Sequence, residues 1–141
     1  MTSQPASRRT VLRGAALAGA AGLGTAACGG GESAPKGPPT PTAPVDLGAP
    51  SAVPVGGSRL YREQRLVVTQ AAKGEFKAFS AVCTHAGCVA DKIEDGKIHC
   101  PCHGSLFDAA TGKVLQGPAG APLPAVPVKA ADGKLIAGPD A

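Results

Sequence analysis

Four of the five cysteines and two of the three histidines lie in two short stretches of the chain. Residues 83–88 read CTHAGC, and residues 100–105 read CPCHGS. Thiolate and imidazole groups are ligands for zinc and for iron–sulfur clusters. One C-x-H pair and one C-x-x-H pair could complete a tetrahedral zinc site: Cys83, His85, Cys100 and His103. That set leaves one further cysteine in each stretch, so the ligand types alone allow a zinc site or an iron–sulfur site.

Three β-hairpins are predicted around these stretches, pairing residues 65–72 with 75–82, 91–94 with 97–100, and 125–130 with 134–138. The last two turn at Asp-Gly, the strongest short-range hairpin signal. Cys83 and Cys100 each follow or end a strand, so the two stretches should be facing loops at one edge of the fold. Ile93 and Ile98 are the expected inward residues of the second hairpin. Strand alternation directs His99 to the face opposite Cys100, which favours an ordinary half-exposed histidine.

The composition is typical of a small domain rich in turns. There are 20 glycines and 14 prolines among 141 residues, which suits loops rather than long helices. After Cys28 there is no apolar stripe with a helical period and no internal repeat. We therefore predict an all-β fold, a small antiparallel barrel or sandwich, whose metal-binding part is the two loops. Once the predicted signal and linker, residues 1–50, are set aside, about 90 residues remain, few enough that a metal or covalent link would help stability.

The N-terminal segment, residues 1–27, is predicted to be an export signal. Arg8 and Arg9 precede a weakly apolar run over residues 14–27, which is shorter than the roughly 20 residues of a membrane-spanning helix. The twin arginine resembles the Tat signal, which exports proteins already folded. A chance arginine pair in an ordinary Sec signal is the alternative.

Cys28 follows this run directly and is a candidate for lipidation. The sequence TAAC resembles a lipobox, although Thr25 stands where leucine is expected. The Gly- and Pro-rich stretch that comes next is typical of an extended tether. We therefore predict a lipid anchor on Cys28, a flexible linker over residues 28–50 and a folded domain over residues 51–139. A diacyl group would supply the two chains that stable membrane attachment needs; a free or buried cysteine is the alternative.

The net charge of +4 overstates the basicity of the exported part. Three arginines, Arg8, Arg9 and Arg13, lie in the signal, which leaves eleven basic against ten acidic residues. There is no basic stripe, and aromatic residues are few. These features argue against nucleic-acid binding.

The two cysteine stretches resemble the two boxes of Rieske iron–sulfur proteins, C-T-H-x-G-C and C-P-C-H-G-S. The likeness covers about residues 50–138, and residues 117–128 resemble the family's proline-containing loop. The resemblance implies one 2Fe–2S cluster per chain, with one iron held by two cysteines and the other by two histidines: Cys83 and Cys100, His85 and His103. It also implies a disulfide between Cys88 and Cys102.

Mixed ligation of this kind changes the charge of the cluster. With two ferric irons, two sulfides, two thiolates and neutral imidazoles, the oxidised site has no net charge, so an electron is added more easily than to an all-cysteine cluster. The expected potential is about −150 to +300 mV, against about −400 mV for plant-type ferredoxins. Reduction also makes the outer imidazole nitrogen more basic, which links electron uptake to proton uptake.

The resemblance further assigns residues around the cluster. Ser105 is expected to donate a hydrogen bond to a bridging sulfide. Gly87 and Gly104 are expected to allow close backbone approach and N–H···S bonds, and Pro118 belongs to the covering loop. Phe107 departs from high-potential relatives, which often carry tyrosine there, so we expect a lower potential than theirs.

The function implied is electron transfer on the outer face of the cytoplasmic membrane. Single electrons would pass from a quinol or a partner subunit to a cytochrome or similar acceptor, as in the Rieske subunit of cytochrome bc complexes. The protein would be a component of an oxidoreductase rather than a stand-alone enzyme. Two alternatives remain: the Rieske ferredoxin of a ring-hydroxylating dioxygenase, which is cytoplasmic and lacks the second cysteine pair, and a structural zinc-binding module.

Overall fold

The computed structural model describes residues 40–141, so the predicted signal and lipidation residues, Arg8, Arg9 and Cys28, lie outside the described residues. The described part contains eleven strands and one short 3-10 helix, η1, and no α-helix. The elements are β1 (Val45–Asp46), η1 (Pro50–Ala52), β2 (Gly57–Tyr61), β3 (Leu66–Ala72), β4 (Glu75–Ser80), β5 (Lys92–Glu94), β6 (Lys97–His99), β7 (Leu106–Asp108), β8 (Val114–Gln116), β9 (Ala125–Val126), β10 (Val128–Ala131) and β11 (Lys134–Ala137). The all-β prediction is confirmed.

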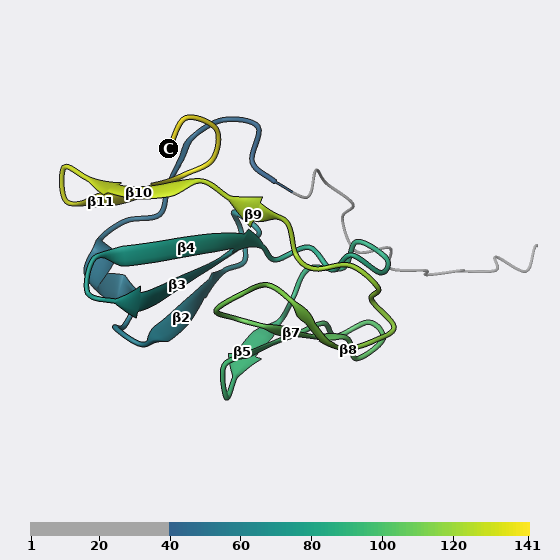
Figure 1. Cartoon of the computed structure of the whole chain (residues 1–141). Helices are drawn as coiled ribbons and strands as arrows, with labels where there is room; N and C mark the ends of the chain where they lie inside the picture. The colour runs from purple at the N-terminus through teal and green to yellow at the C-terminus, as the bar shows by residue number, and fades with distance from the viewer. Residues whose placement is uncertain (1–39) are drawn as a thin grey trace, which may run out of the picture. The chain divides into compact units, whose positions relative to one another are not determined.

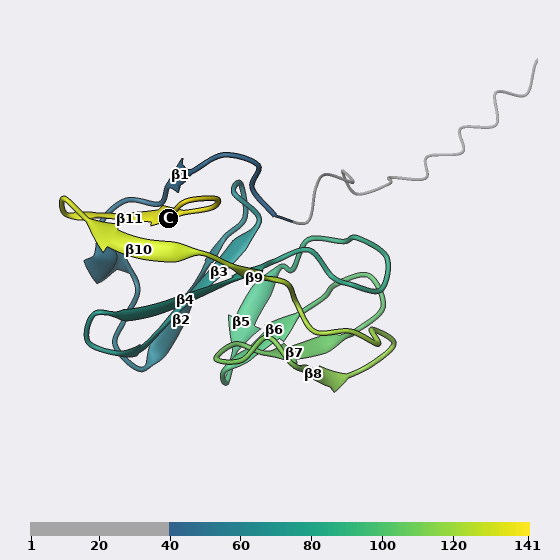
Figure 2. The same ribbon diagram turned by 45° about the horizontal axis from the view of Figure 1, so that its top comes forward.

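The strands form three antiparallel sheets, in the orders β1-β11-β10, β2-β3-β4-β9 and β5-β6-β7-β8. Figures 1 and 2 both show the β5–β8 sheet beside the β2–β4 strands, joined to them by the segment after β4 and the segment before β9. The β5–β8 sheet is a meander, because each strand pairs with the next one along the chain. The cysteine stretches belong to this sheet: the first precedes β5, and the second joins β6 to β7.

The tight turns of the sheets form where the sequence predicts them. β3 and β4 pair around Lys73-Gly74, β5 and β6 around Asp95-Gly96, and β10 and β11 around Asp132-Gly133. At both Asp-Gly turns the two central residues have positive φ, 49° and 70° in the first and 51° and 74° in the second. Two successive positive φ values are the requirement of a type I′ turn, which aspartate and glycine tolerate best.

The β2-β3-β4-β9 sheet is buried on both faces. Along β3, the side chains of Leu66, Val67 and Val68 are all fully buried. Val67 packs with Phe79 in a first cluster, the loop-side core, whereas Leu66 and Val68 pack in a second, the far core. The loop-side core consists of Val67, Phe79, Ala81, Cys83, Cys88, Ala90, Ile98, Cys100, Phe107, Ala109, Ala119 and Leu123. The far core consists of Leu47, Val53, Leu66, Val68, Ala78, Val126, Leu135 and Ala137.

The ordered unit begins before residue 51. β1 pairs with β11 through Val45 and Ala137, within the stretch that the sequence analysis assigned to the linker. A strand of two residues is too short to have a recognisable alternation, so only its partner strand reveals it. Within residues 40–141 no helix has the length and apolar character needed to cross a bilayer.

Candidate metal centre

Strand register places three loops at the same end of the β5–β8 sheet. Lys92 pairs with His99, His99 with Leu106, and Leu106 with Gln116, so these four residues form one row across the sheet. The chain enters the row at Lys92 from residues 83–91, leaves and re-enters it through residues 100–105, and leaves it at Gln116 toward residues 117–124. The meander therefore positions both cysteine stretches and the proline-containing segment together. Below, residues 83–88 are loop 1 and residues 100–105 are loop 2.

Loops 1 and 2 are each closed by two backbone hydrogen bonds at equivalent positions. The first cysteine of each donates its N–H to the carbonyl five residues on: Cys83 to Cys88 at 2.7 Å, and Cys100 to Ser105 at 2.9 Å. The glycine in each, Gly87 or Gly104, donates its N–H back to the carbonyl of that cysteine, at 2.9 and 3.2 Å. Both glycines have positive φ, 79° and 78°, which only glycine adopts without strain.

The glycine N–H groups thus help to close the loops, and their expected N–H···S bonds to the cluster stay a prediction. The backbone donors directed at the Cys100 sulfur are those of Cys102 and His103. Gly87 and Gly104 therefore act on the site through loop shape.

The two thiols that are not in the disulfide lie together inside the protein. Cys83 is 3% exposed and Cys100 is 4% exposed, and both are free. Their sulfurs are within hydrogen-bonding reach of each other. Burial raises the pKa of the Cys100 thiol, an effect opposed by the N–H groups of Cys102 and His103. Two buried thiols are poorly reactive while they are protonated but become a good ligand pair once a cation replaces the protons.

The two loop histidines lie at the surface and contact each other. The ring centroids of His85 and His103 are 4.7 Å apart, with the rings nearly perpendicular at 88°. Both residues are exposed. The candidate ligands are therefore arranged as a buried sulfur pair and an exposed imidazole pair, one member of each pair from each loop.

The remaining loop cysteines form the disulfide that the resemblance implied. Cys88 is bonded to Cys102, at a sequence separation of 14 residues. Cys88 is buried and Cys102 is exposed. The bond fixes the distance between loops 1 and 2 independently of any metal, because it joins the end of one to the middle of the other.

The proline-containing segment is hydrogen-bonded to both loops. The Thr84 hydroxyl donates to the Ala121 carbonyl at 2.6 Å. The Ala119 N–H donates to the Ser105 hydroxyl oxygen at 3.0 Å, and Ser105 is completely buried. Because this oxygen already accepts from Ala119, the hydroxyl hydrogen is available for another partner, and it has no acceptor among residues 40–141. Pro118, next to Ala119, is exposed.

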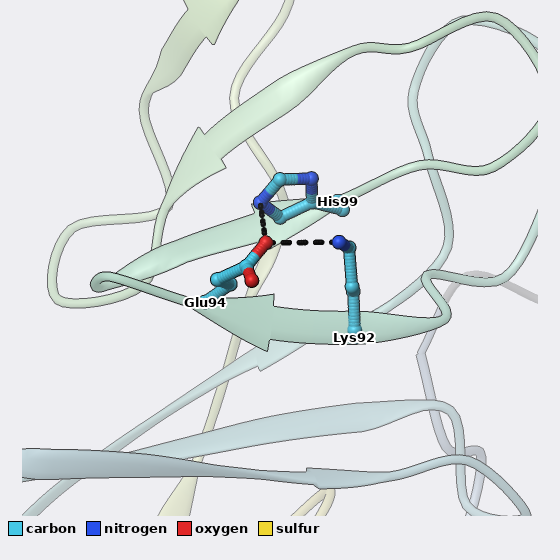
Figure 3. Close-up of polar contacts among 3 residues, drawn as sticks. All are labelled: Lys92, Glu94 and His99. Carbon is cyan, nitrogen blue, oxygen red and sulfur yellow. Dashed lines mark hydrogen bonds and ion pairs between the residues drawn. The ribbon is translucent and has the colours of Figure 1, made fainter.

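Phe107 and His99 complete the predicted set. Phe107 is 1% exposed and packs in the loop-side core. His99 lies on the opposite side of its strand from buried Ile98, as alternation predicts, and its Nε2 is 3.9 Å from a Glu94 oxygen (Figure 3). That carboxylate also accepts from Lys92 at 2.9 Å, which lowers the pKa of Glu94. His99 therefore belongs to an exposed charged group on the sheet and is separate from the loop histidines.

A comparison with protein-family models matches residues 42–127 to the Rieske [2Fe-2S] domain. The match spans more than half of the chain and includes both loops and the proline-containing segment. The chain belongs to this family. The cofactor is accordingly a 2Fe–2S cluster.

The described residues of this Rieske chain fit such a cluster. Among residues 40–141, no three Cys, His, Asp or Glu side chains surround one point as the ligands of a single ion do. The donors are instead divided into two pairs of different chemistry, which suits two irons with unequal ligands. The uncommitted hydroxyl hydrogen of buried Ser105 is a donor of the kind that iron–sulfur centres use.

Curated relatives include subunits of redox complexes. The chain is 37% identical over 94 residues to the cytochrome b6-f complex iron-sulfur subunit of Chlorobaculum tepidum, a match covering 64% of this chain and 50% of that protein. The same subunit of Synechococcus elongatus is 43% identical over 75 residues, 52% of this chain and 41% of that one. The chain thus spans about half the length of these curated relatives.

Among solved structures, the plasma membrane Rieske protein PetC3 of Synechocystis PCC 6803 matches with a TM-score of 0.52 at 29% identity, covering 66% of this chain and 97% of that one. This likeness extends over nearly the whole of the solved protein. It agrees with the all-β prediction for the described residues.

Three partners of the loops were not identified from the sequence. Thr84 donates to the Ala121 carbonyl, and Ala119 donates to the Ser105 hydroxyl, each across segments far apart in the chain. Gln116 donates to the Gly104 carbonyl at 3.0 Å. Thr84 lies inside the first motif, so its residue type was the one sequence feature that could have indicated such a contact. Ala119 and Gln116 act through a backbone group and through strand register, neither of which leaves a mark on residue type.

Proposed function

We propose that this Rieske protein is a one-electron carrier whose redox centre is formed by loops 1 and 2. The observation that supports it best is the arrangement of the donors, with two buried sulfurs from two loops and two imidazoles from the same loops at the surface. A redox centre that is buried on one side and exposed on the other is protected from solvent chemistry yet can contact a partner. The relatives, iron–sulfur subunits of cytochrome complexes, are in keeping with this role.

The ligands proposed are Cys83 and Cys100 for one iron, and His85 and His103 for the other. When bound, the cluster supplies reversible one-electron chemistry at a potential above that of all-cysteine clusters. The chain's own residues fix the ligand positions: the paired loop closures orient the cysteines, and the disulfide sets the separation of the loops. The ligand cysteines need no reorganisation on electron transfer, because both are packed in the loop-side core.

The exposed imidazoles are proposed to hold a proton when the centre is reduced. Each histidine has one ring nitrogen free for this, if the other is a ligand. Electron uptake would then be accompanied by proton uptake at these nitrogens. Ser105 is proposed to stabilise the reduced state with the hydroxyl hydrogen that Ala119 leaves free. Phe107 can give no such bond, which favours a moderate potential.

We also propose that the protein works outside the cytoplasmic membrane. Residues 1–27 would be the Tat-type signal, Cys28 the lipid anchor, and the Gly- and Pro-rich stretch before β1 the tether of the redox domain, which includes β1 through its pairing with β11. The Cys88–Cys102 bond supports export, because disulfides persist in oxidising compartments. The electron donor would be a quinol or partner subunit and the acceptor a cytochrome. Electron transfer in a dioxygenase is the second candidate, and the disulfide weighs against it.

Two measurements test the proposal. The purified protein, reduced with dithionite, should give the low-average-g EPR signal of a mixed-ligand 2Fe–2S centre, and His103→Ala should remove it while the far core keeps the domain folded. A colourless, well-folded wild-type protein containing zinc would refute the ligand assignment. Cell fractionation of wild type and Cys28→Ala tests the anchor: wild type should sediment with membranes, and the variant should not.

A further inference from the structure

A cavity of about 420 Å³ lies against loop 2, beside the disulfide. Arg62, Glu63 and Arg65, all in the connection between β2 and β3, line one part of it. Pro101 and Cys102 of loop 2 line another part, together with Cys88 and Val89. The cavity therefore brings two arginines next to the loop that carries His103, although about 40 residues separate them in the chain.

The loops themselves carry no formal charge. Residues 82–90, 100–107 and 117–128 contain no Asp, Glu, Lys or Arg. The exposed surface around the two histidines is therefore uncharged and built of small residues and prolines. The charged residues that line the cavity beside loop 2 are Arg62, Glu63 and Arg65, two positive side chains and one negative.

The charged side chains that line the cavity, Arg62, Glu63 and Arg65, have no ion-pair partner in the described part of the chain. The contrast is Arg59, whose guanidinium lies 5.4 Å from the Tyr61 ring centroid and donates to the Ala52 carbonyl. Arg65 has a φ of 56°, which a long side chain adopts only at a cost of about 1 kcal/mol or more. Its backbone is tied on both sides, by its N–H to Arg62 and by its carbonyl to Ala81.

We infer that Arg62 and Arg65 form an electrostatic docking site for a redox protein with an acidic rim around an uncharged contact patch. This inference rests on the proposed electron transfer and names the class of partner. Complementary charges at the edge of a contact raise the rate of encounter, while the uncharged centre makes the close contact. In the reaction one electron leaves the reduced centre and reduces one metal ion of the partner.

The test compares two soluble acceptors by stopped-flow: an acidic plastocyanin-type copper protein, whose Cu²⁺ becomes Cu⁺, and the basic mitochondrial cytochrome c. The variant Arg62→Gln/Arg65→Gln removes two positive charges beside loop 2. At residue 65, where φ is positive, it places a side chain of similar shape. The matched control is Lys73→Gln/Lys77→Gln, the first in the β3–β4 turn and the second within β4. It removes the same charge from the whole protein.

At low ionic strength we expect the loop-2 variant to react roughly five-fold more slowly with the acidic protein and no more slowly with the basic one. The control should change both rates less than two-fold, and Glu63→Gln should accelerate the acidic reaction. The effect should vanish at about 0.5 M salt, where charges a few ångströms apart are screened. Equal effects of the two double variants would refute the docking site, since only net charge would matter. If the wild type shows a Rieske EPR signal but reduces neither acceptor, the proposed function itself fails.

Discussion

Replacing Ser105 with alanine tests both halves of its assignment, the contact that the structure contains and the contact that we propose. The hydroxyl oxygen accepts from the buried Ala119 N–H at 3.0 Å, and this N–H would be left without a partner. Such a loss costs about 1–3 kcal/mol of folding free energy. The variant should therefore melt at a lower temperature than the wild type by several degrees.

The potential gives the second readout. A hydrogen bond to a charged group is worth about 1.5–3 kcal/mol, and only the part that is stronger in the reduced state shifts the potential. A difference of about 1.5 kcal/mol corresponds to roughly 65 mV for one electron. We therefore expect protein-film voltammetry to give a potential about 50–100 mV lower for Ser105→Ala.

Ser58→Ala is the matched control. The Ser58 hydroxyl shares a 2.7 Å hydrogen bond with Thr69 in the β2–β3 pair and is not part of the loops. This variant should lose stability with no change of potential. If Ser105→Ala is destabilised as expected but keeps its potential within about 15 mV, the hydroxyl does not reach the centre and only the contact to Ala119 is real.

Three further predictions follow from the same contacts. Phe107→Tyr should raise the potential measured by voltammetry, and an unchanged value would remove Phe107 as the reason for a moderate potential. Replacing both Cys88 and Cys102 with serine should lower stability by about 3 kcal/mol in urea titrations, because the bond closes a loop of this length; stability equal to wild type would contradict this. Gly112→Ala places a Cβ 2.7 Å from the Phe79 ring at a φ of 71° and should destabilise by about 2 kcal/mol or more in thermal melts, whereas Gly120→Ala meets nothing and should be neutral.

The features predicted from the sequence are those encoded within a few neighbouring residues. The Asp-Gly turns, the two loops and the inward direction of Ile98 need only local spacing, and the structure contains all of them. Asp108 caps the turn that follows it, accepting from the N–H groups of Ala110 and Thr111. Local hydrogen bonds of this kind are specified by residue type and offset alone.

The features that were missed depend on contacts between distant segments. Full burial of Leu66, Val67 and Val68 on two faces gives no polar alternation, so the sequence could not indicate that a second core lies behind this strand. The contact of Ala119 with Ser105 uses a backbone N–H, for which any residue but proline would serve. The arginines beside loop 2 are positioned by a sheet connection whose spacing contains no motif.

Because one sheet separates the two cores, the residues that pack around the loop cysteines differ from those that stabilise the rest of the fold. Every loop cysteine except exposed Cys102 is packed in the loop-side core, and none lies in the far core. Substitutions in the far core, for example at Leu135, can therefore raise or lower the stability of the fold without changing the reduction potential. Evolution could therefore adjust thermal stability through the far core and the choice of redox partner through the loop side, with neither change constraining the other.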